Sequence, residues 1–336
     1  MPKKLKILYA LQGTGNGHAA RALEIIPLLK NFAKVDILIS GSQSQVKLNE
    51  PIQHTYRGVV FYYSKRGGVN YLKTLFNNSL ISLFKELNKV PIRDYDLVIN
   101  DFEAISAWAC KLRKVPIIGL SHQASFLSDK TPRPAKKDWL GELILRYYAP
   151  VEKNIGFHFK PYDNFIFPPV IRADIRQAIL SNLGHYTVYL PAYADDKLIK
   201  ILLKIEGVSW QLFSRKAKEE KQEGNVLICP IDAKEFAKSI TSSAGLLCSA
   251  GFEGPSEALF LGKKLFVVPI KGQYEQYCNA AALNELGVPS LKVLNEQSLE
   301  PLRDWLQKEQ NIQIDFPDQT KEILEREVFA TSKLGT

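Results

Sequence analysis

The chain has 336 residues and a mass of 37.9 kDa, which suits two domains of about 150 residues each. Hydrophobic residues form 46% and charged residues 24% of it, a balance that excludes disordered, collagen-like and coiled-coil proteins. No segment reaches the roughly 18 consecutive apolar residues that a membrane span needs. The four cysteines show no C-x-x-C spacing, which argues against zinc and a disulfide framework and favours the reducing cytoplasm.

The net charge of +9 is unevenly distributed along the chain. Residues 1–165 hold 24 basic and 13 acidic side chains, a net charge of +11, whereas residues 166–336 hold 20 and 22, a net charge of −2. A basic half beside a nearly neutral half indicates an anionic partner for the first, such as a phosphate-bearing substrate, a membrane surface or a nucleic acid. The plain alternative is that this charge serves only solubility.

In chain order, apolar runs alternate with amphipathic stretches and predict repeated strand–helix–strand units. The chain opens on an apolar run that enters a glycine-rich loop, so it is interpreted as a strand rather than a secretory signal. A helix is expected over residues 19–32, and strands over residues 5–11, 35–40, 96–100, 115–120 and 165–167. After a proline-rich connection at 167–172 the pattern restarts, with strands over residues 187–190, 210–213, 225–229, 245–248 and 265–268 and a last helix over 317–329.

These elements predict an α/β protein with two doubly wound, Rossmann-like domains that face a cleft. The first domain is expected over residues 1–167 and the second over residues 168–316. A C-terminal helix and tail over residues 317–336 is expected to pack back on the first domain. The default binding site is the cleft between the domains.

The segment over residues 69–90 is strongly apolar, with interspersed lysines. One interpretation is a pair of core helices. The other is an exposed apolar surface that grips a lipid or the membrane interface.

The first strand ends in a glycine-rich loop of Gly13, Thr14, Gly15, Asn16 and Gly17, followed by His18. Glycines allow a tight turn close to a ligand, and the helix N-terminus behind them favours an anionic group. A dinucleotide fingerprint is disfavoured, because its third glycine position holds His18 and the second strand ends without an acidic residue. A histidine at the lip of a cleft suits a general base, whereas the alternative is a helix cap or a phosphate contact.

The most informative segment comes after the strand at 245–248 and opens a helix. It contains Ser249, Gly251, Phe252, Glu253, Gly254, Pro255 and Glu257. Backbone N–H groups at such a turn can hold a diphosphate, and Glu257, one helical turn further on, can accept both hydroxyls of a ribose. After the next strand, Glu275 and Gln276 form an acid–amide pair suited to sugar hydroxyls.

These motifs resemble glycosyltransferases of the GT-B type, which have two Rossmann-like domains, and most closely families 1 and 28, including the N-acetylglucosaminyltransferase of lipid II synthesis. The spacing from Gly251 to Glu257 matches the family 1 donor signature, and Gly262, Pro269, Glu275, Gln276, Asn279 and Ala280 follow in its order. Ser249 stands where that signature has histidine, and Gly254 stands where it has serine. The loop at residues 13–18 resembles the family 28 sequence G-G-T-G-G-H, and residues 169–174 resemble its interdomain segment.

The resemblance implies a nucleotide-sugar donor, in particular a UDP-sugar, held by the second half. Residues 225–232 resemble the strand and turn whose backbone reads the base, with Ile231 against uracil. The implied donor residues are Ile231, Ser249, Gly251, Phe252, Glu253, Gly254, Pro255, Glu257, Glu275 and Gln276, with Arg215 and Lys271 as candidates for balancing the charge of the leaving group. On the acceptor side, His122 and Gln123 resemble a family 28 loop and join the loop at residues 13–17.

Asp101 ends an expected strand on the same side as the glycine-rich loop. It resembles the aspartate that family 1 enzymes place behind the catalytic histidine, where a carboxylate selects the imidazole tautomer and stabilises its charged form. The alternative is an N-cap for the helix that follows. His18 and Asp101 are the expected catalytic residues.

The expected function is an inverting hexosyltransferase that moves a sugar from a UDP-sugar, its co-substrate, to an acceptor hydroxyl without a cofactor or metal. The D-x-D sequence at Asp94 and Asp96 is interpreted as a strand entry rather than a metal site. An anionic or lipid-linked acceptor and a peripheral position at the inner face of the membrane fit the basic half, and no nucleic acid is expected as partner. The alternatives are a UDP-sugar epimerase of the same architecture and a sugar-nucleotide-binding protein without turnover.

Overall fold

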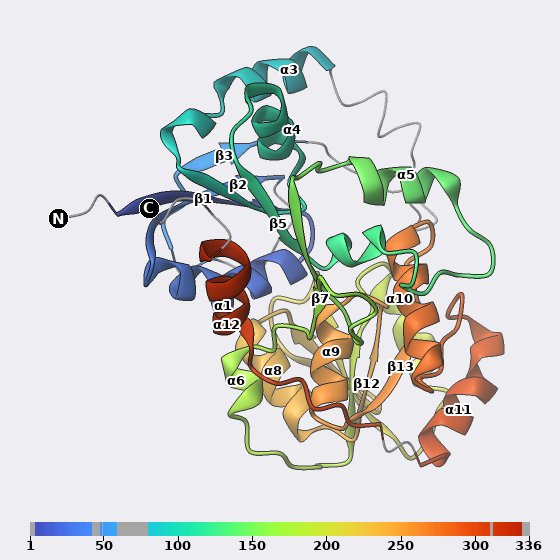
Figure 1. Ribbon diagram of the computed structural model, residues 1–336. Helices are drawn as coiled ribbons and strands as arrows, with labels where there is room; N and C mark the ends of the chain where they lie inside the picture. Colours follow the sequence, from blue (N-terminus) through green and yellow to red (C-terminus); the bar gives the residue numbers. More distant parts are fainter. Residues whose placement is uncertain (1–3, 42–47, 49, 59–79, 310–311, 331–336) are drawn as a thin grey trace.

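The computed structural model describes the chain except residues 1–3, 42–47, 49, 59–79, 310–311 and 331–336. Two sheets flanked by helices lie one above the other in Figure 1. The first sheet has the strand order β3-β2-β1-β4-β5-β6-β7, and the second has the order β10-β11-β9-β8-β12-β13. The two Rossmann-like units predicted from the restarting pattern are confirmed.

The first sheet is parallel throughout. Its elements are β1 (Leu5–Gln12), α1 (Gly17–Lys30), β2 (Ala33–Ser40), β3 (His54–Tyr56), α3 (Leu80–Lys89), η1 (Ile92–Asp94), β4 (Leu97–Asp101), α4 (Ala104–Arg113), β5 (Ile117–Ser121), η2 (Gln123–Leu127), α5 (Trp139–Tyr147), β6 (Lys153–Phe157) and β7 (Ile166–Phe167). Residues 7–11 of β1 form an unbroken apolar run because helices cover both faces of the strand. Ile7 and Tyr9 pack in the cluster that contains α1, whereas Leu8 and Ala10 pack in the cluster that contains α4.

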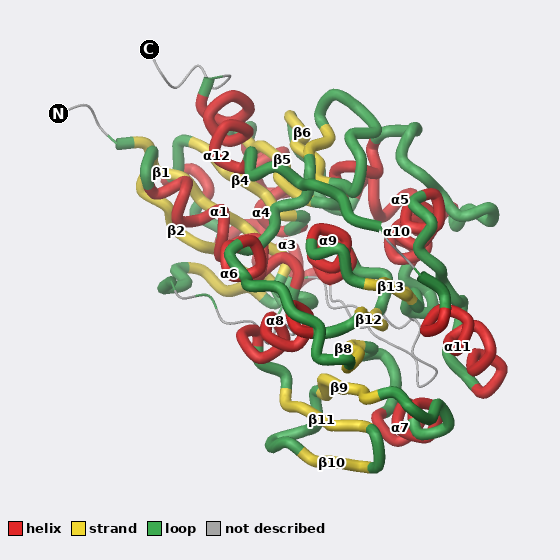
Figure 2. The backbone as a smooth tube through the Cα atoms, turned by 90° about the horizontal axis from the view of Figure 1, so that it is seen from below, coloured by secondary structure: helices red, strands yellow, loops and turns green. Residues whose placement is uncertain are grey.

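The second sheet is parallel except for the edge strand β10, which pairs antiparallel with β11. Its elements are α6 (Ala173–Arg176), β8 (His185–Tyr189), α7 (Asp195–Leu202), β9 (Ser209–Ser214), β10 (Lys221–Glu223), β11 (Val226–Pro230), α8 (Ala233–Ser242), β12 (Gly245–Cys248), α9 (Glu253–Phe260), β13 (Lys264–Val267), α10 (Tyr274–Glu285), η3 (Glu296–Ser298) and α11 (Leu299–Gln307). Figure 2 shows α8 and α7 on opposite sides of these strands. Accordingly, Leu246 packs in the cluster with α8 and α9, and its neighbour Leu247 packs with α7 and α11.

The last helix that the structure describes returns to the first sheet's unit. The helix α12 (Thr320–Ile323) continues as the π-helix η4 (Leu324–Phe329), drawn in red beside the blue α1 in Figure 1. The ring of Phe329 lies 4.7 Å from that of Phe32, and Glu327 pairs with Lys153 of β6 at 2.7 Å. The last helix therefore begins at Thr320 rather than at residue 317, and it packs back on the first unit as expected.

Three of the described strands do not follow from the sequence pattern. The edge strands β3 and β10 have three residues each, too few to show a period. The strand β6 lies inside the sheet but contains Gly156, where a Cβ would sit 2.9 Å from the backbone nitrogen of Ser125 in η2. This close approach requires a glycine, which interrupts the apolar run.

Of the apolar segment at 69–90, residues 69–79 lie outside the described residues. The remainder contains α3, whose Leu83 and Leu87 pack against the cluster of α4, whereas Phe84 is 62% exposed. The described part is thus half core and half exposed surface, so neither interpretation of this segment applies to it alone.

Candidate active site

The loops that follow strands of the first sheet meet those that follow strands of the second. A Cβ on Gly17, after β1, would lie 3.1 Å from Cγ of Glu253, after β12. Gln123, after β5, donates from Nε2 to Oε2 of Glu275, after β13, at 3.0 Å. The two sheets therefore face each other with their carboxyl ends, the edge at which open α/β sheets bind ligands.

The glycine-rich loop after β1 depends on its glycines at two positions. A Cβ on Gly13 would lie 2.5 Å from the carbonyl oxygen of Gly41. Gly15 has a φ of +92°, in the left-handed region that favours glycine. Asn16 then precedes α1 and donates to the hydroxyl of Tyr189 in the second unit at 3.4 Å. The loop therefore turns tightly and reaches across the cleft.

His18 and Asp101 are in contact, as the sequence predicts. Nδ1 of His18 lies 2.9 Å from Oδ1 of Asp101, which is fully buried at the end of β4. Because an ionised carboxylate only accepts hydrogen bonds, this contact assigns the proton to Nδ1 and leaves a lone pair on Nε2. The His18 side chain is 11% exposed. Such a histidine can take a proton at Nε2 while Asp101 stabilises the resulting charge.

The alternative role for Asp101, an N-cap of α4, belongs to another residue. The carboxylate of Glu103 accepts the backbone N–H groups of Ile105 at 2.7 Å and Ser106 at 2.6 Å. Glu103 therefore caps α4, and both carboxylate oxygens of Asp101 are directed to His18 and its helix.

Arg21 also contacts Asp101, and it is not among the residues predicted from the sequence. His18, Arg21 and Asp101 are called the base corner below. Its guanidinium donates to both oxygens of Asp101, from Nε at 3.1 Å and from Nη2 at 2.8 Å. Its Nη1 donates to Oε1 of Glu253 at 2.5 Å. One signal was present: Arg21 follows His18 by three positions, so both lie on one face of α1. Arg21 is followed by Ala22, Ile25 and Ile26 on the buried side of α1, and a charged residue among buried apolar ones indicates a partner.

The two carboxylates that Arg21 contacts differ in their pKa. Burial raises the pKa of Asp101, but the charges of Arg21 and His18 outweigh it, so the pKa lies below the ordinary value. Burial also raises the pKa of Glu253; Arg21 opposes this, Glu257 and Asp101 add to it, and the result is about 7. At neutral pH Asp101 is ionised, whereas Glu253 titrates.

The predicted donor turn lies between β12 and α9. A Cβ on Gly251 would meet no atom within 4 Å, so the backbone here faces open space. The helix α9 begins at Glu253, with Gly254 and Pro255 in its first turn, while Ser249 donates from its backbone to the carbonyl of Tyr189 at 3.1 Å. The first N–H groups of a helix lack partners within it and attract anions, so this turn can hold a diphosphate.

Glu257 is buried one turn into α9 and is already paired. Arg172, from the connection between the units, donates from Nε to Oε1 at 2.6 Å and from Nη2 to Oε2 at 3.2 Å. Burial is the largest influence on Glu257 and raises its pKa despite Arg172. A ribose bound here must share this carboxylate with Arg172.

Glu275 and Gln276 lie at the start of α10, with different roles in the structure. Glu275 receives the hydrogen bond from Gln123 across the cleft. The Oε1 atom of Gln276 accepts the backbone N–H of Ile270 at 2.9 Å and supports the loop before α10. The predicted donor-side and acceptor-side pairs are thus in direct contact.

His122 is a buried tie between the two units. Its Nδ1 lies 2.8 Å from the carbonyl oxygen of Phe157, and its Nε2 lies 2.8 Å from Oδ1 of Asn279. Its ring stacks on Phe252 with centroids 3.9 Å apart and an interplanar angle of 4°. Both ring nitrogens are engaged, so an acceptor would meet His122 only after these contacts open.

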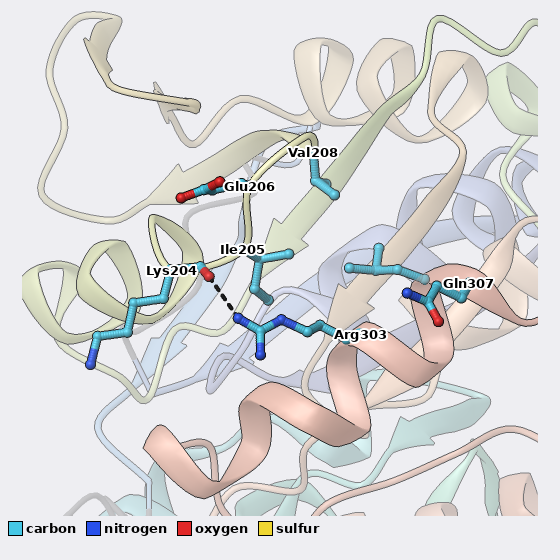
Figure 3. Close-up of a pocket in the computed structure, with 7 residues that line it drawn as sticks. Lys204, Ile205, Glu206, Val208, Arg303 and Gln307 are labelled. Carbon is cyan, nitrogen blue, oxygen red and sulfur yellow. Dashed lines mark hydrogen bonds between the residues drawn. The ribbon is translucent and has the colours of Figure 1, made fainter.

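The other predicted residues lie in loops at the carboxyl ends of the strands of the second sheet. Ile231 follows β11 and is half-buried, while Arg215, after β9, and Lys271, after β13, are exposed. A separate hollow of about 580 Å³ lies before β9, at the amino ends of the strands of this sheet (Figure 3). Its lining is formed by Lys204, Ile205, Glu206, Val208, Arg303, Leu306 and Gln307. This hollow is therefore distinct from the predicted donor site.

No group of three or more His, Cys, Asp or Glu side chains in the described part of the chain is arranged to hold a metal ion. In the D-x-D sequence, Oδ2 of Asp96 accepts the backbone N–H of Lys6 at 2.8 Å. That bond ties the entry of β4 to β1, in line with the interpretation as a strand entry.

Two largely parallel sheets whose carboxyl ends meet through polar side chains define a GT-B fold, and solved structures agree. MurG of Acinetobacter baumannii matches with a TM-score of 0.54 at 16% identity, over 96% of this chain and 98% of that chain. A UDP-glucosyltransferase of Polygonum tinctorium, in complex with 3,4-dichloroaniline, gives 0.59 at 13% identity over 96% and 93%. The spinosyn rhamnosyltransferase SpnG, in complex with thymidine diphosphate, gives 0.55 at 12% identity over 90% and 92%.

A comparison of the sequence with family models identifies the family. Residues 5–308 match the family model for glycosyl transferase family 1, so the chain belongs to that family. No curated protein sequence matches it. The protein is thus a glycosyltransferase, as the resemblance of its motifs implied.

Proposed function

We propose that the protein is an inverting glycosyltransferase that moves a sugar from a UDP-sugar to an acceptor hydroxyl, independently of metal. The observation that carries this proposal is the 2.9 Å contact between His18 and the buried Asp101, across the cleft from the open turn at Gly251. A histidine oriented by a carboxylate is suited to remove a proton, and a helix N-terminus is suited to hold a diphosphate.

In the proposed reaction, Nε2 of His18 accepts the proton of the acceptor hydroxyl as its oxygen attacks the anomeric carbon. The bond to the diphosphate breaks in the same displacement, which inverts the configuration. Asp101 stabilises the imidazolium, and the N-terminus of α9 stabilises the departing diphosphate, where negative charge develops. Glu257 holds the ribose, and Glu275 with Gln276 orients the sugar.

The domain division proposed for this reaction is residues 1–167 for the acceptor and residues 168–316 for the donor, with residues 317–336 returning to the first domain. Closure of the two halves would exclude bulk water from the donor and slow its hydrolysis. The contacts of His122 and Gln123 with the second half support this proposal, because they hold the halves together at the cleft.

Thermal unfolding with UDP, TDP, GDP and NAD tests the donor site. A ligand at about 100 times its dissociation constant adds roughly 2.7 kcal/mol to stability. We expect stabilisation by UDP and a loss of this response in Glu257→Gln, which keeps the size of the side chain beside Arg172. No response of the parent protein to UDP or TDP would contradict the proposed donor.

We further propose that the acceptor is anionic or lipid-linked, and that α5 brings the protein to an anionic membrane surface on the cytoplasmic side. Trp139, Leu143 and Tyr147 follow at every fourth position of α5 and are 73%, 44% and 56% exposed. Lys136 and Lys137 precede them and are exposed as well. An apolar and aromatic helix face next to basic side chains suits an anionic lipid interface. Within the residues that the structure describes, no helix is long and apolar enough to cross a membrane.

Co-sedimentation with lipid vesicles tests the role of α5. We expect binding to phosphatidylglycerol vesicles, little binding to phosphatidylcholine vesicles, and about tenfold weaker binding of the double variant Trp139→Ser, Leu143→Ser. Ile179, 93% exposed in the second half, provides the matched control Ile179→Ser, which should bind as the parent does. Equal binding of both variants would contradict the role of α5.

A further inference from the structure

The ion pair between Arg21 and Glu253 joins the predicted base to the predicted donor turn. Arg21 belongs to α1 of the first half, and Glu253 is the first residue of α9 in the second half. Their side chains are 2% and 17% exposed. The same guanidinium holds both oxygens of Asp101, so one side chain touches the carboxylate behind His18 and the opposite wall of the cleft.

We propose that Arg21 and Glu253 are positioning residues that make the general base effective only when the second half has closed onto the first. The inference rests on the proposed roles of His18 and Asp101 and adds a condition to them. Arg21 and Asp101 are both in the first half and stay together when the halves separate. Glu253 moves away with α9, so domain position changes the charge around the base.

The argument is one of charge balance. Proton transfer to His18 creates a positive charge beside Arg21, whose Nη2 lies 3.3 Å from Nδ1 of the histidine. Like charges at this distance repel strongly in a buried site. Arg21 and protonated His18 carry two positive charges, and Asp101 alone balances one of them. Asp101 and Glu253 together balance both. The protonated base is therefore electrically balanced only with Glu253 in place.

The surroundings of Glu253 make this balance sensitive to pH. Arg21, Asp101 and His18 face it from the first half, and Glu257 faces it from its own helix; with burial as the largest influence, its pKa is about 7. Below that pH, Glu253 is protonated and the second negative charge is lost. The reaction thus requires Glu253 to lose its proton as the pH rises through about 7.

The experiment measures UDP released from UDP-glucose, UDP-galactose and UDP-N-acetylglucosamine with water as acceptor. Glu253→Gln should lower kcat about tenfold with little change in KM, because the transition state and not the bound donor loses a charge. The slope of log kcat/KM against pH on the acid side should be smaller by about one in Glu253→Gln than in the parent, because one titrating carboxyl group is removed. Unchanged kcat and slope would overturn the proposal.

A matched control is Glu142→Gln. The carboxylate of Glu142 also joins the halves, since it accepts the hydroxyl of Tyr274 at 2.7 Å, but it does not contact the base corner. This variant should keep the parent kcat and slope. If it loses as much activity as Glu253→Gln, the effect reflects weakened closure in general, and the specific role of Glu253 is overturned.

Two results separate this inference from the proposed function. If His18→Ala keeps the parent rate, the base assignment fails and the inference falls with it. If His18→Ala is inactive while Glu253→Gln is unchanged, only the inference fails. A readout independent of turnover is the low-field proton resonance of the hydrogen-bonded Nδ1–H of His18 with UDP bound. It should shift in Glu253→Gln and stay in place in Glu142→Gln; no shift in Glu253→Gln contradicts the coupling.

Discussion

Two buried carboxylates in this protein each accept hydrogen bonds from one arginine at both oxygens. The two pairs differ in what surrounds them. Asp101 and Arg21 are 0% and 2% exposed, and both belong to the first half. Glu257 and Arg172 are 6% and 13% exposed, and they join α9 to the connection between the halves. The pKa of Asp101 is lowered, whereas that of Glu257 is raised because burial outweighs its arginine.

The difference teaches that similar pairs serve different purposes. Asp101 has a histidine as a further partner and keeps its charge, so it suits a group that must stay ionised throughout a reaction. The raised pKa of Glu257 means that it is protonated more readily than Asp101, and the side chain of Arg172 is more exposed than that of Arg21. This second pair is therefore better suited to exchange a protein partner for the hydroxyls of a ligand. The predictions below test this contrast.

The largest effect is expected at the base corner. His18→Ala should lower turnover by about 10²–10⁴-fold and leave the affinity for UDP nearly intact, because the imidazole acts on the acceptor proton. Glu257→Gln should show the reverse pattern, with weaker UDP binding and a smaller loss of kcat. Steady-state kinetics combined with UDP titration distinguishes the two, and the same pattern in both variants would remove the contrast.

The second prediction concerns folding stability at neutral pH. Asp101→Asn leaves Arg21 buried without its full counter-charge and should cost about 3–5 kcal/mol. Glu257→Gln, at the more exposed pair, should cost about 1–3 kcal/mol. Urea unfolding of both variants and the parent at one pH provides the comparison. Equal losses would mean that exposure does not separate the pairs.

The third prediction concerns pH. The pKa of Glu253 in the folded protein, about 7, exceeds its ordinary value of 4.5, so folding favours the protonated form. Its contribution to stability is complete below the ordinary value and is lost as the pH rises through 7. Between about pH 5 and pH 8 the parent should lose up to about 3 kcal/mol that Glu253→Gln does not lose. Unfolding measured at both pH values checks this, and parallel losses in the two proteins would contradict the assignment.

The smallest effects are expected at two glycines on opposite walls of the cleft. Gly13→Ala should destabilise the protein by about 1–3 kcal/mol, because the added Cβ would lie 2.5 Å from the backbone oxygen of Gly41. Gly251→Ala should leave stability nearly unchanged, since no atom lies within 4 Å, and should weaken UDP binding. Thermal unfolding with and without UDP separates the two; a large loss of stability in Gly251→Ala would be inconsistent with an open turn.

Much of the fold follows from the sequence because its buried strands are continuous apolar runs. The strands β1, β4 and β12 show this directly, and the turns behind them carry the predicted motifs. The contact of His18 with Asp101 also follows, since Asp101 ends β4 and His18 lies in the first turn of α1, after the neighbouring parallel strand β1. Short edge strands and β6 carry no comparable pattern.

The long-range ion pairs could not be predicted in the same way. Arg21 and Glu253 lie 232 positions apart, and Arg172 and Glu257 lie 85 positions apart. The first pairing depends on how the two halves are placed and the second on how the connection packs on α9, and no local pattern encodes either. Arg21 could at most be marked as a buried cation in need of a partner.

The return of the chain to its first half has a mechanical consequence. The backbone passes between the halves once near Pro169 and again between α11 and α12, where Phe316 is buried in the core. Two adjacent covalent crossings oppose a free swivel, which one crossing would permit, and leave mainly a bending about the line that joins them. Opening of the two halves is thus mainly a hinge rotation about this line. Such a rotation returns Glu253 to the same place opposite Arg21 on every closure.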